Sequence, residues 1–337
     1  MNISRRQALI GASAMLALTS GRAFGQAKTE IALSRQPGIL YLPTHIIEKQ
    51  KLIEKHAEAL GVSGVTTTWT QFANGGSQQD ALISNNVDII NTGTGPLLLM
   101  WDKTKGRVKG ICASSAQPLT FISRDPRIKT LKDLQSGDKI AVPTVKVSTQ
   151  AILLQMAASE LFGADKWDHF DPMTVQLGHP DAFIALKNPD HEVKNHFAAP
   201  PYHYYELKDV PGAHVVITSP EIIGSPLSQG QFMTTTEFAD GNPKIIAAVR
   251  AAAEEAKKFI ETNLNDSLAI YKEVTGDKTE VAKLADMLSQ PGMDEWNLFP
   301  QGTMKFAAHL HKVGSLKTLP ASWQDYYLPA SHDLAGN

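Results

Sequence analysis

The feature that most constrains the fold is a pair of loops rich in small residues within the stretch 69–100. The first loop, 74–77 (NGGS), follows a β-rich run at 65–69 and precedes a helical pattern. The second, 91–96 (NTGTGP), follows a short apolar run at 87–90 and also precedes an apolar helix. Two successive strand–loop–helix units predict neighbouring parallel strands in an α/β sheet.

Both loops have the composition of a binding site for a negatively charged group. Glycine lets the backbone approach a ligand closely, and the free N–H groups at a helix start favour negative charge. Ser77 and Thr94 add hydroxyl groups. Ligands of open α/β sheets bind beyond the carboxyl ends of the strands, where these loops would lie. One such loop is equally consistent with an ordinary helix cap, but two in succession favour a ligand site.

The same alternation of strands and helices extends along the chain. Besides the run at 87–90, strands are predicted at 28–34, 62–69 (which contains the run at 65–69), 108–113, 119–122, 139–142, 174–177, 193–198, 213–218 and 232–236. Helices are predicted at 43–60, 150–162, 181–186, 244–263, 265–275, 278–289 and 301–313. Asn242 and Pro243 form a good start for the long helix. The aromatic tail 323–328 is expected to pack back onto the surface.

The first 27 residues have the pattern of an export signal. Arg5 and Arg6 precede an apolar run at 8–18, which is too short to span a bilayer. Small residues at 23–27 offer a cleavage site, and the paired arginines resemble a twin-arginine signal. The alternative is a buried N-terminal helix. We therefore expect a periplasmic location for the remaining chain.

Composition excludes several classes of function. The formal net charge is −2, so no electrostatic case exists for a nucleic-acid partner or an anionic membrane surface. The single cysteine, Cys112, cannot form an internal disulfide, and its apolar neighbours predict a buried strand. About 310 residues beyond the signal are enough for two domains.

Four segments of the sequence resemble one family. The stretch 69–98 resembles a segment of the periplasmic substrate-binding proteins of nitrate, sulfonate and taurine ABC importers, a family that includes binders of thiamine-pyrimidine precursors. LKDLQSGDKIAVPTVKVSTQAILLQMAASELFG at 131–163 resembles the strand, loop and helix of the family's second lobe. AFIALKN and HFAAPPY at 182–202, and the run 234–260, resemble its ligand-facing strand end and its returning strand and long helix.

The resemblance implies the two-lobed type II periplasmic-binding-protein fold, an α/β fold in which each lobe is a mainly parallel sheet flanked by helices. Lobe 1 is expected to comprise 28–115 and 226–337, and lobe 2 to comprise 116–225, after an export signal at 1–27. The two crossovers are expected near 114–118 and 219–229. Closure of the lobes on a ligand creates the shape that a membrane permease recognises.

The resemblance also implies which residues face the cleft between the lobes. The lobe-two loop carries Lys146 and Val147 where small residues are common in the family, and Asp181 lies beside a possible ligand contact. These departures argue against a simple sulfonate. The expected ligand-binding residues are Arg35, Gln36, Asn74, Gly75, Gly76, Ser77, Thr92, Gly93, Thr94, Ser115, Ser148, Thr149, His179 and Tyr202.

Several aromatic residues would favour a ring-containing ligand if they faced the cleft. The candidates are Trp69, Phe72, Tyr41, Tyr202, Tyr204 and Tyr205. The alternative for Trp69 is a place in the core of the sheet. The ligand is therefore expected to be a small organic anion, such as a sulfonate, or a heteroaromatic compound.

A metal-binding protein and an enzyme are the two alternative functions to consider. Five histidines at 169, 179, 191, 196 and 203 gather with acidic residues, but they lack a metal-binding spacing such as His-Glu-x-x-His. No Gly-x-Ser-x-Gly elbow or P-loop motif is present. We expect no metal, no cofactor and no catalysis in a monomer that delivers a small molecule to ABC permease subunits. A pyrimidine-synthase-like enzyme and a periplasmic ligand sensor are the remaining alternatives.

Overall fold

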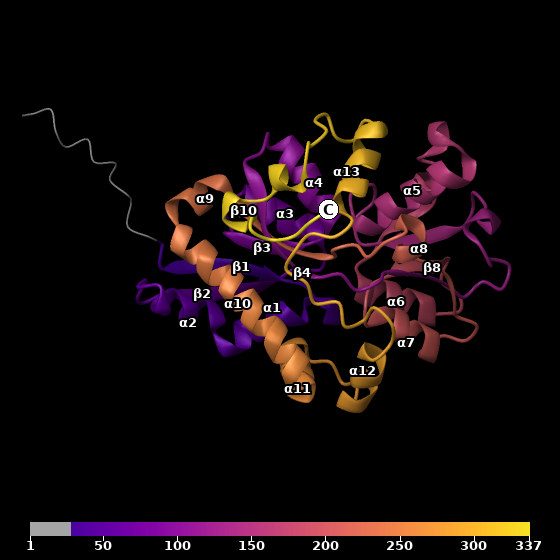
Figure 1. Cartoon of the computed structure of the whole chain (residues 1–337). Coiled ribbons are helices and arrows are strands. Elements are labelled where there is room, and N and C mark those ends of the chain that lie inside the picture. Colours follow the sequence, from indigo (N-terminus) through magenta and orange to yellow (C-terminus); the bar gives the residue numbers. More distant parts are fainter. Residues whose placement is uncertain (1–27) are drawn as a thin grey trace, which may run out of the picture.

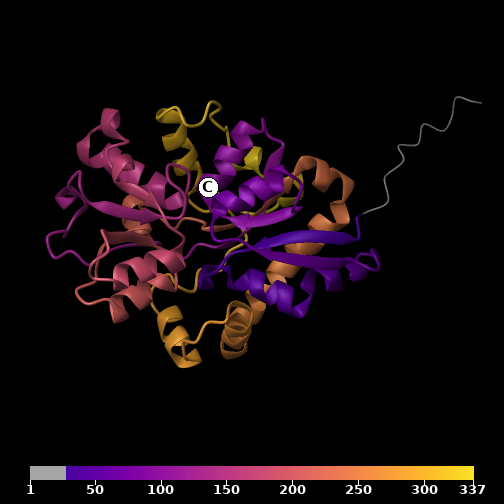
Figure 2. The same ribbon diagram turned by 180° about the vertical axis from the view of Figure 1, so that it is seen from behind.

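Two five-stranded sheets, placed side by side, form the framework of the protein (Figure 1). The computed structural model describes residues 28–337, and the predicted export signal at 1–27 lies outside the described residues. We call the first sheet and its helices lobe 1, and the second sheet and its helices lobe 2. Seen from behind in Figure 2, the two lobes remain distinct, and helices α11 and α12 lie at one edge of their junction.

The sheet of lobe 1 has the strand order β2-β1-β3-β10-β4. Its first three strands run parallel, whereas β10 is antiparallel to both of its neighbours. Side chains alternate between two cores, so that Ile89 faces one and Ile90 the other, as the period of a strand requires. Its strands are β1 (Glu30–Arg35), β2 (Thr66–Gln71), β3 (Ile89–Thr92), β4 (Val108–Ser115) and β10 (Gly230–Thr235).

The sheet of lobe 2 has the equivalent order β7-β6-β8-β5-β9. Strands β6, β7 and β8 run parallel, and β5 is antiparallel to β8 and β9. Its strands are β5 (Thr120–Ser123), β6 (Lys139–Val142), β7 (Thr174–Gln176), β8 (Val193–Ala198) and β9 (His214–Thr218). The predicted fold of two mainly parallel α/β lobes is confirmed, with one reversed strand in each sheet.

Each reversed strand is the first that the chain forms after it enters a lobe. The chain leaves lobe 1 after β4 and begins lobe 2 with β5, and it returns after helix α8 to form β10. A strand that arrives from the other lobe enters the sheet from the end facing that lobe, and it therefore runs opposite to the others. The predicted domain limits, 115/116 and 225/226, fall within these two connections and stay a prediction.

Helices cover both faces of each sheet. Helices α1, α2 and α10 pack on one face of the lobe 1 sheet, while α3 and α4 lie on the other (Figure 1). No helix within 28–337 has both the length and the apolar character needed to cross a bilayer. The helices are α1 (Leu42–Gln50), α2 (Leu52–Ala59), α3 (Gly75–Ile83), α4 (Thr94–Lys103), α5 (Thr149–Phe162), α6 (His179–Lys187), α7 (Tyr202–Asp209), α8 (Ser219–Ile223), α9 (Thr236–Gly241), α10 (Pro243–Thr262), α11 (Leu264–Thr275), α12 (Val281–Leu288) and α13 (Thr303–Lys312). Short 3₁₀ turns occupy Ile39–Tyr41, Leu131–Asp133, Ala164–Lys166, Asp171–Met173, Trp323–Tyr326 and Pro329–Ser331.

The single helix predicted at 43–60 is wrong, because the chain breaks it into α1 and α2 at Lys51. Lys51 adopts the left-handed conformation, with φ 52° and ψ 44°. The break lets α1 pack on α10 and α11 while α2 packs on α10. The sequence does not predict this break, since the residue at the turn is a lysine rather than a glycine.

Replacing Lys51 by glycine is expected to stabilise the protein. A left-handed conformation costs a residue with a side chain about 1–2 kcal/mol, and glycine avoids this cost. Part of the gain is lost because glycine also gives the unfolded chain more freedom. We therefore expect the free energy of unfolding to rise by roughly 0.5–1 kcal/mol, as measured by urea denaturation. A decrease in stability would show that the Lys51 side chain makes a favourable contact.

The aromatic tail lies in the core rather than on the surface, which corrects the expectation from the sequence. Trp323, Tyr326 and Tyr327 are buried, and the latter two are completely inaccessible to solvent. Tyr327 occupies the space beside Gly110 of β4, where a Cβ atom would lie 2.7 Å from the tyrosine ring. The backbone N–H of Leu328 donates to the carbonyl oxygen of Gly110 at 2.8 Å. The tail therefore completes the edge of the lobe 1 sheet.

Candidate ligand-binding site

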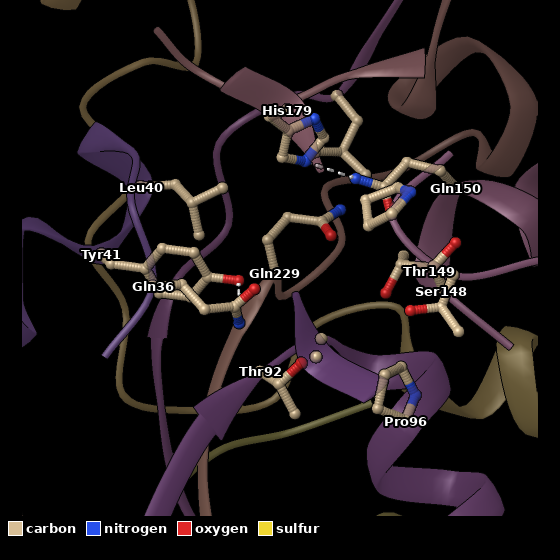
Figure 3. A pocket seen from close by; sticks show the side chains of 15 residues that line it. Gln36, Leu40, Tyr41, Thr92, Pro96, Ser148, Thr149, Gln150, His179 and Gln229 are labelled. Carbon is tan, nitrogen blue, oxygen red and sulfur yellow. Dashed lines mark hydrogen bonds between the residues drawn. The ribbon is translucent and has the colours of Figure 1, made fainter. Parts of the chain in front are cut away.

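A small cavity lies between the two lobes, beyond the carboxyl ends of strands from both sheets (Figure 3). Its wall combines apolar groups with polar side chains that carry no formal charge. No aspartate, glutamate, lysine or arginine is among the described residues that line it. The lining residues are Gln36, Leu40, Tyr41, Gly75, Thr92, Gly93, Pro96, Leu119, Pro143, Thr144, Ser148, Thr149, Gln150, His179 and Gln229.

Four helices, two from each lobe, begin at this cavity. Gly75 opens α3, Gly93 precedes α4, Ser148 and Thr149 open α5, and His179 opens α6. The N–H groups of a first turn have no partner within their own helix, and each helix start carries a partial positive charge. Helix starts that converge on an otherwise uncharged cavity favour a negatively charged ligand.

Side-chain caps fix the start of two of these helices. The Asn74 side-chain oxygen accepts hydrogen bonds from the backbone N–H and the hydroxyl of Ser77, at 3.0 and 2.9 Å. The Ser148 hydroxyl accepts from the N–H of Ala151 at 3.3 Å. The sequence folds locally in this way because Asn and Ser are strong N-cap residues. Asn74 and Ser77 thus serve α3 itself, and neither side chain lines the cavity.

The lobe 1 side of the cavity is held by a buried network centred on Gln36. Its amide nitrogen lies within hydrogen-bond distance of the Tyr41 hydroxyl at 2.8 Å, the Gln78 side-chain oxygen at 2.9 Å and the carbonyl oxygen of Asn91 at 3.1 Å. Gln78 in turn donates to the Ser34 hydroxyl at 2.7 Å. Buried polar groups with partners fix side-chain positions, so this wall of the cavity is preorganised.

The lobe 2 side of the cavity is formed by His179, which rests on further buried polar groups. His179 Nε2 lies 3.2 Å from the Gln150 side-chain nitrogen, and Nδ1 lies 2.8 Å from Nε2 of His196. His196 Nδ1 is 2.5 Å from a carboxylate oxygen of Glu206. Tyr202 stacks on the His179 ring, with 5.7 Å between ring centroids. Tyr202 therefore orients a cavity residue without lining the cavity.

Burial perturbs the titration of this lobe 2 group. Desolvation lowers the pKa of His179 well below its ordinary value and also lowers the pKa of His196. Desolvation raises the pKa of Glu206 well above its ordinary value. Burial disfavours every charged form, and the three residues together favour a neutral assembly.

The lobes are in close contact around the cavity, and glycines make this contact possible. A Cβ atom on Gly93 would lie 2.3 Å from the Thr149 hydroxyl, and one on Gly95 would lie 2.5 Å from Ile152, both in lobe 2. Gly76 likewise faces Thr144. The backbone N–H of Gly95 donates to the Thr149 hydroxyl across the junction at 3.4 Å. The structure therefore represents a closed arrangement of the lobes.

The closed cavity is small. The space in which the centres of water molecules fit is ≈ 40 Å³. One water needs about 10–15 Å³ of such space and takes roughly 30 Å³ of liquid volume, so the cavity corresponds to three or four waters, or about 100 Å³. That volume matches a ligand of a few heavy atoms and is smaller than a substituted aromatic ring.

The structure places half of the sequence-predicted site residues on this cavity. Gln36, Gly75, Thr92, Gly93, Ser148, Thr149 and His179 line it. The others lie behind it or away from it. Arg35 pairs with Glu48, and the Thr94 hydroxyl donates to the carbonyl oxygen of Ser228 at 2.6 Å. Ser115 is buried next to the returning strand at Gly230. The residues outside the lining are Arg35, Asn74, Gly76, Ser77, Thr94, Ser115 and Tyr202.

Sequence reasoning missed the remaining lining residues, apart from Tyr41, which was among the aromatic candidates for the cleft. Gln150 directly follows the predicted Ser148-Thr149 helix start, so the same signal could have included it. Gln229 lies in the predicted second crossover, where a polar residue next to the hinge was a usable signal. Leu40 and Leu119 carry no local signal, because apolar residues of this kind are more often part of a core. The missed residues are Leu40, Pro96, Leu119, Pro143, Thr144, Gln150 and Gln229.

Of the aromatic residues considered as cleft residues, Tyr41 alone is among those lining the cavity. Trp69 packs against the core of lobe 1. The Tyr205 hydroxyl donates to Asp277 at 2.7 Å and so links α7 of lobe 2 to the segment after α11. Residues 28–337 contain no group of three His, Cys, Asp or Glu residues arranged to hold a metal ion. Cys112 is buried, and burial raises the pKa of its thiol to about 12.

Two α/β lobes joined by two connections, with a cavity at their junction, define the fold of the periplasmic binding proteins. The alkanesulfonate-binding protein SsuA from Xanthomonas axonopodis pv. citri, bound to MOPS, superposes with a TM-score of 0.69 at 15% identity, covering 89% of this chain and 99% of that one. The periplasmic aliphatic sulphonate binding protein SsuA from Escherichia coli gives 0.66 at 17% identity, with coverage of 90% and 92%. The periplasmic nitrate-binding protein NrtA from Synechocystis PCC 6803 gives 0.62 at 14% identity, with coverage of 88% and 84%.

These similarities confirm, at the level of the fold, the resemblance found in the sequence. No protein-family model matches the chain, and no curated protein matches it. The shared fold extends over nearly the whole described chain, which places both lobes and both connections within it. The identities are too low for the fold alone to define a ligand, which has to be argued from the cavity.

Proposed function

We propose that this protein is the extracytoplasmic solute-binding component of an ABC importer and that it captures a small anion between its two lobes. The observation that carries the proposal is the convergence of four helix starts, two from each lobe, on one uncharged polar cavity. Because each lobe supplies half of the cavity wall, a ligand there favours the closed arrangement over an open one.

The cavity supports an anion over a heteroaromatic compound. Its polar groups include hydroxyls of Thr92, Thr144 and Thr149, which can donate to oxyanion oxygens. Helix starts offer positive potential without a cation, so an anion is held by dipoles in a partly dry site. Tyr41 is the one aromatic side chain among the described lining residues besides His179, and the small volume favours a ligand smaller than a large ring. Nitrate and short alkanesulfonates fit these limits.

A bound ligand stabilises the closed shape of the protein, and we propose that membrane permease subunits recognise this shape and receive the ligand. The similar structures include binding proteins for sulfonates and nitrate, and one is described as the ligand-binding component of an ABC-type import system. The export-signal pattern at 1–27 supports a periplasmic location, and we propose that the protein acts there as a monomer. Detection of the protein in the periplasmic fraction, lost when Arg5 and Arg6 are replaced by lysine, would support the twin-arginine route.

Thermal unfolding with a panel of anions tests the proposed ligand class. The panel comprises nitrate, bicarbonate, methanesulfonate, ethanesulfonate, taurine and, as larger compounds, an aryl sulfonate and a thiamine-pyrimidine precursor. An anion present at 100 times its Kd should add about 2.7 kcal/mol to the free energy of unfolding, which is readable as a rise in Tm. We expect a rise with at least one small anion and none with the larger compounds.

The same experiment separates binding from the alternatives. The protein is first unfolded, washed and refolded, so that no ligand retained from purification can mask the shift in Tm. No shift with any small anion would contradict the proposal. Recovery of the bound compound unchanged after incubation distinguishes a binding protein from an enzyme on this fold. A sensor would bind equally well but would not restore uptake of the anion when supplied with its permease.

A further inference from the structure

A continuous chain of hydrogen-bonding side chains runs from the cavity into lobe 2. It begins with Gln150 and His179 at the cavity wall, passes through His196 of β8 and ends at Glu206 of α7. His196 and Glu206 are completely inaccessible to solvent. His179 keeps some exposed surface, and Figure 3 shows its ring at the cavity beside Gln150. The chain therefore connects a buried carboxyl group to the ligand site.

This chain has one hydrogen-bond arrangement when Glu206 is ionised. The carboxylate then accepts the Nδ1–H of His196, and His196 Nε2 accepts the Nδ1–H of His179. His179 Nε2 carries no proton and accepts from the Gln150 amide. In this arrangement the Gln150 amide nitrogen faces His179 and its oxygen is left as an acceptor at the cavity, and the chain as a whole carries one negative charge.

Adding one proton reverses the hydrogen bonds between His179, His196 and Glu206. It also requires the Gln150 amide to turn its oxygen toward His179 Nε2, because the amide nitrogen that lies there cannot accept a hydrogen bond. A solvent proton binds His179 Nε2 at the cavity, the Nδ1 proton of His179 moves to His196 Nε2, and the Nδ1 proton of His196 moves to Glu206. Bonds to hydrogen form at His179 Nε2, His196 Nε2 and Glu206, and the two Nδ1–H bonds of the histidines break. The chain therefore takes up one proton in total. All three residues are then neutral, His179 Nε2–H donates to the Gln150 oxygen, and the Gln150 amide N–H groups are donors at the cavity.

We propose that Glu206 is a positioning residue for ligand selection, which acts through His196, His179 and Gln150 by switching the group that Gln150 presents to the cavity between acceptor and donor. The proposal rests on the proposed function and names its ligand class more closely, as an anion that is bound together with one proton. An anion would meet a donor and a neutral chain in the protonated state. In the ionised state it would meet an acceptor and a buried negative charge.

The surroundings of the chain favour the protonated, neutral state. Desolvation raises the pKa of Glu206 well above its ordinary value, while it lowers the pKa of both histidines, so an added proton comes to rest on the carboxyl group. The second carboxylate oxygen of Glu206 is buried without a partner among the described residues, which is less costly for a neutral acid than for an anion. No lysine or arginine is among the described groups that shift the pKa of any of the three residues.

The titratable groups that face the chain come from the helices packed around it. His203 of α7 is buried next to His196, and burial lowers its pKa to about 4, so it stays neutral near pH 7. Tyr202 stacks on His179, and its burial raises its own pKa, so it also stays neutral. Asp181 of α6 and Asp277 after α11 lie near Tyr202.

Nitrogen NMR of the histidine side chains in the free protein tests the switch without a ligand. The pattern of couplings reports which ring nitrogen carries the proton. Between pH 5 and 9 we expect the proton of both His179 and His196 to move from Nε2 at low pH to Nδ1 at high pH, in a single shared transition. The Glu206→Gln variant should keep the Nε2–H pattern throughout, because its amide can donate but cannot ionise. Wild-type rings whose tautomers stay constant would overturn the proposal, whether or not the variant folds.

Proton uptake on binding tests the link to ligand selection. Sodium nitrate and sodium ethanesulfonate are added to the protein in unbuffered sodium chloride, and a glass electrode records the protons taken up. Above the pKa of Glu206 we expect about one proton per anion bound, with Kd rising about tenfold per pH unit as the carboxyl ionises. Glu206→Gln should bind with no uptake and a flat pH profile. Glu221→Gln, which removes an exposed carboxylate in the same lobe, should behave like the wild type.

The outcomes separate this inference from the proposed function. Binding of either anion without proton uptake would overturn the role of Glu206 while it supports a binding protein. A tautomer switch without binding of either anion would support the chain as a proton switch and contradict the proposed ligand class.

Discussion

Replacing Gly93 by alanine is expected to abolish capture of a small anion while leaving the fold intact. Gly93 has an ordinary extended conformation, with φ −75°, so alanine adds no backbone strain. The new Cβ atom would lie 2.3 Å from the Thr149 hydroxyl of the other lobe, which is far inside van der Waals contact. The two lobes can then no longer approach each other as closely as they do in this structure. We expect Kd to rise at least about 100-fold, equivalent to roughly 2.7 kcal/mol, by isothermal titration calorimetry.

Two further variants separate lobe closure from other effects of Gly93→Ala. Gly137→Ala is the matched control, because a Cβ atom there would meet nothing within 4 Å, and it should bind like the wild type. Gly93→Ala combined with Thr149→Ala removes the clashing hydroxyl. The double variant should recover the smaller radius of gyration of the closed form in small-angle scattering, even if the lost hydroxyl weakens binding. Unchanged affinity of Gly93→Ala would contradict the closed arrangement as the binding state.

Replacing Tyr327 by alanine is expected to destabilise the protein strongly, although this residue lies near the end of the chain. Tyr327 is completely buried, and its hydroxyl donates to the side-chain oxygen of Gln231. Gln231 in turn donates to the Thr94 hydroxyl at 2.9 Å, next to the start of α4. Loss of a large buried aromatic ring costs about 3–5 kcal/mol, and the unpaired Gln231 adds to this. Urea denaturation should show the loss as a lower midpoint with an unchanged slope.

The matched control for this prediction lies in the same segment. Leu319 is 52% exposed, so Leu319→Ala should change the free energy of unfolding by less than about 0.5 kcal/mol. A small effect of Tyr327→Ala would show that the tail is not an integral part of the lobe 1 core. A strong effect together with weaker anion binding would show that the network through Gln231 and Thr94 also supports the helix start at the cavity.

Apolar residues that recur every two residues predicted all ten strands within a few residues of their ends. Apolar residues that recur every 3.6 residues predicted the longer helices. Strand β8 and strand β6 begin and end where the sequence predicts. Helix α7 was missed, because the tyrosines and histidines at its start show no clear helical period. The break at Lys51 was missed for a related reason, since only packing against α10 and α11 favours two helices over one there.

The candidate site likewise has features that the sequence predicted and features that it did not. The glycine-rich and hydroxyl-rich helix starts could be recognised from the sequence because the chemistry of such a start is local, involving residues three or four apart. Whether a given residue of a start faces the ligand depends on the other lobe. Asn74 caps its own helix and Thr94 bonds to Ser228 in the connection before β10, whereas Gln150 and Gln229 reach the cavity.

The sequence by itself determined the class of fold, the order of the strands and helices, and the loops that carry the helix starts, because periodicity and capping act over a few neighbouring residues. Only the tertiary structure decided the reversed strands, the burial of the tail and the chain from Glu206 to the cavity. Those features join residues far apart in the sequence, such as Gly110 with Tyr327 and His179 with Glu206. Their energies come from packing and desolvation, and both exist only once the lobes have folded around them.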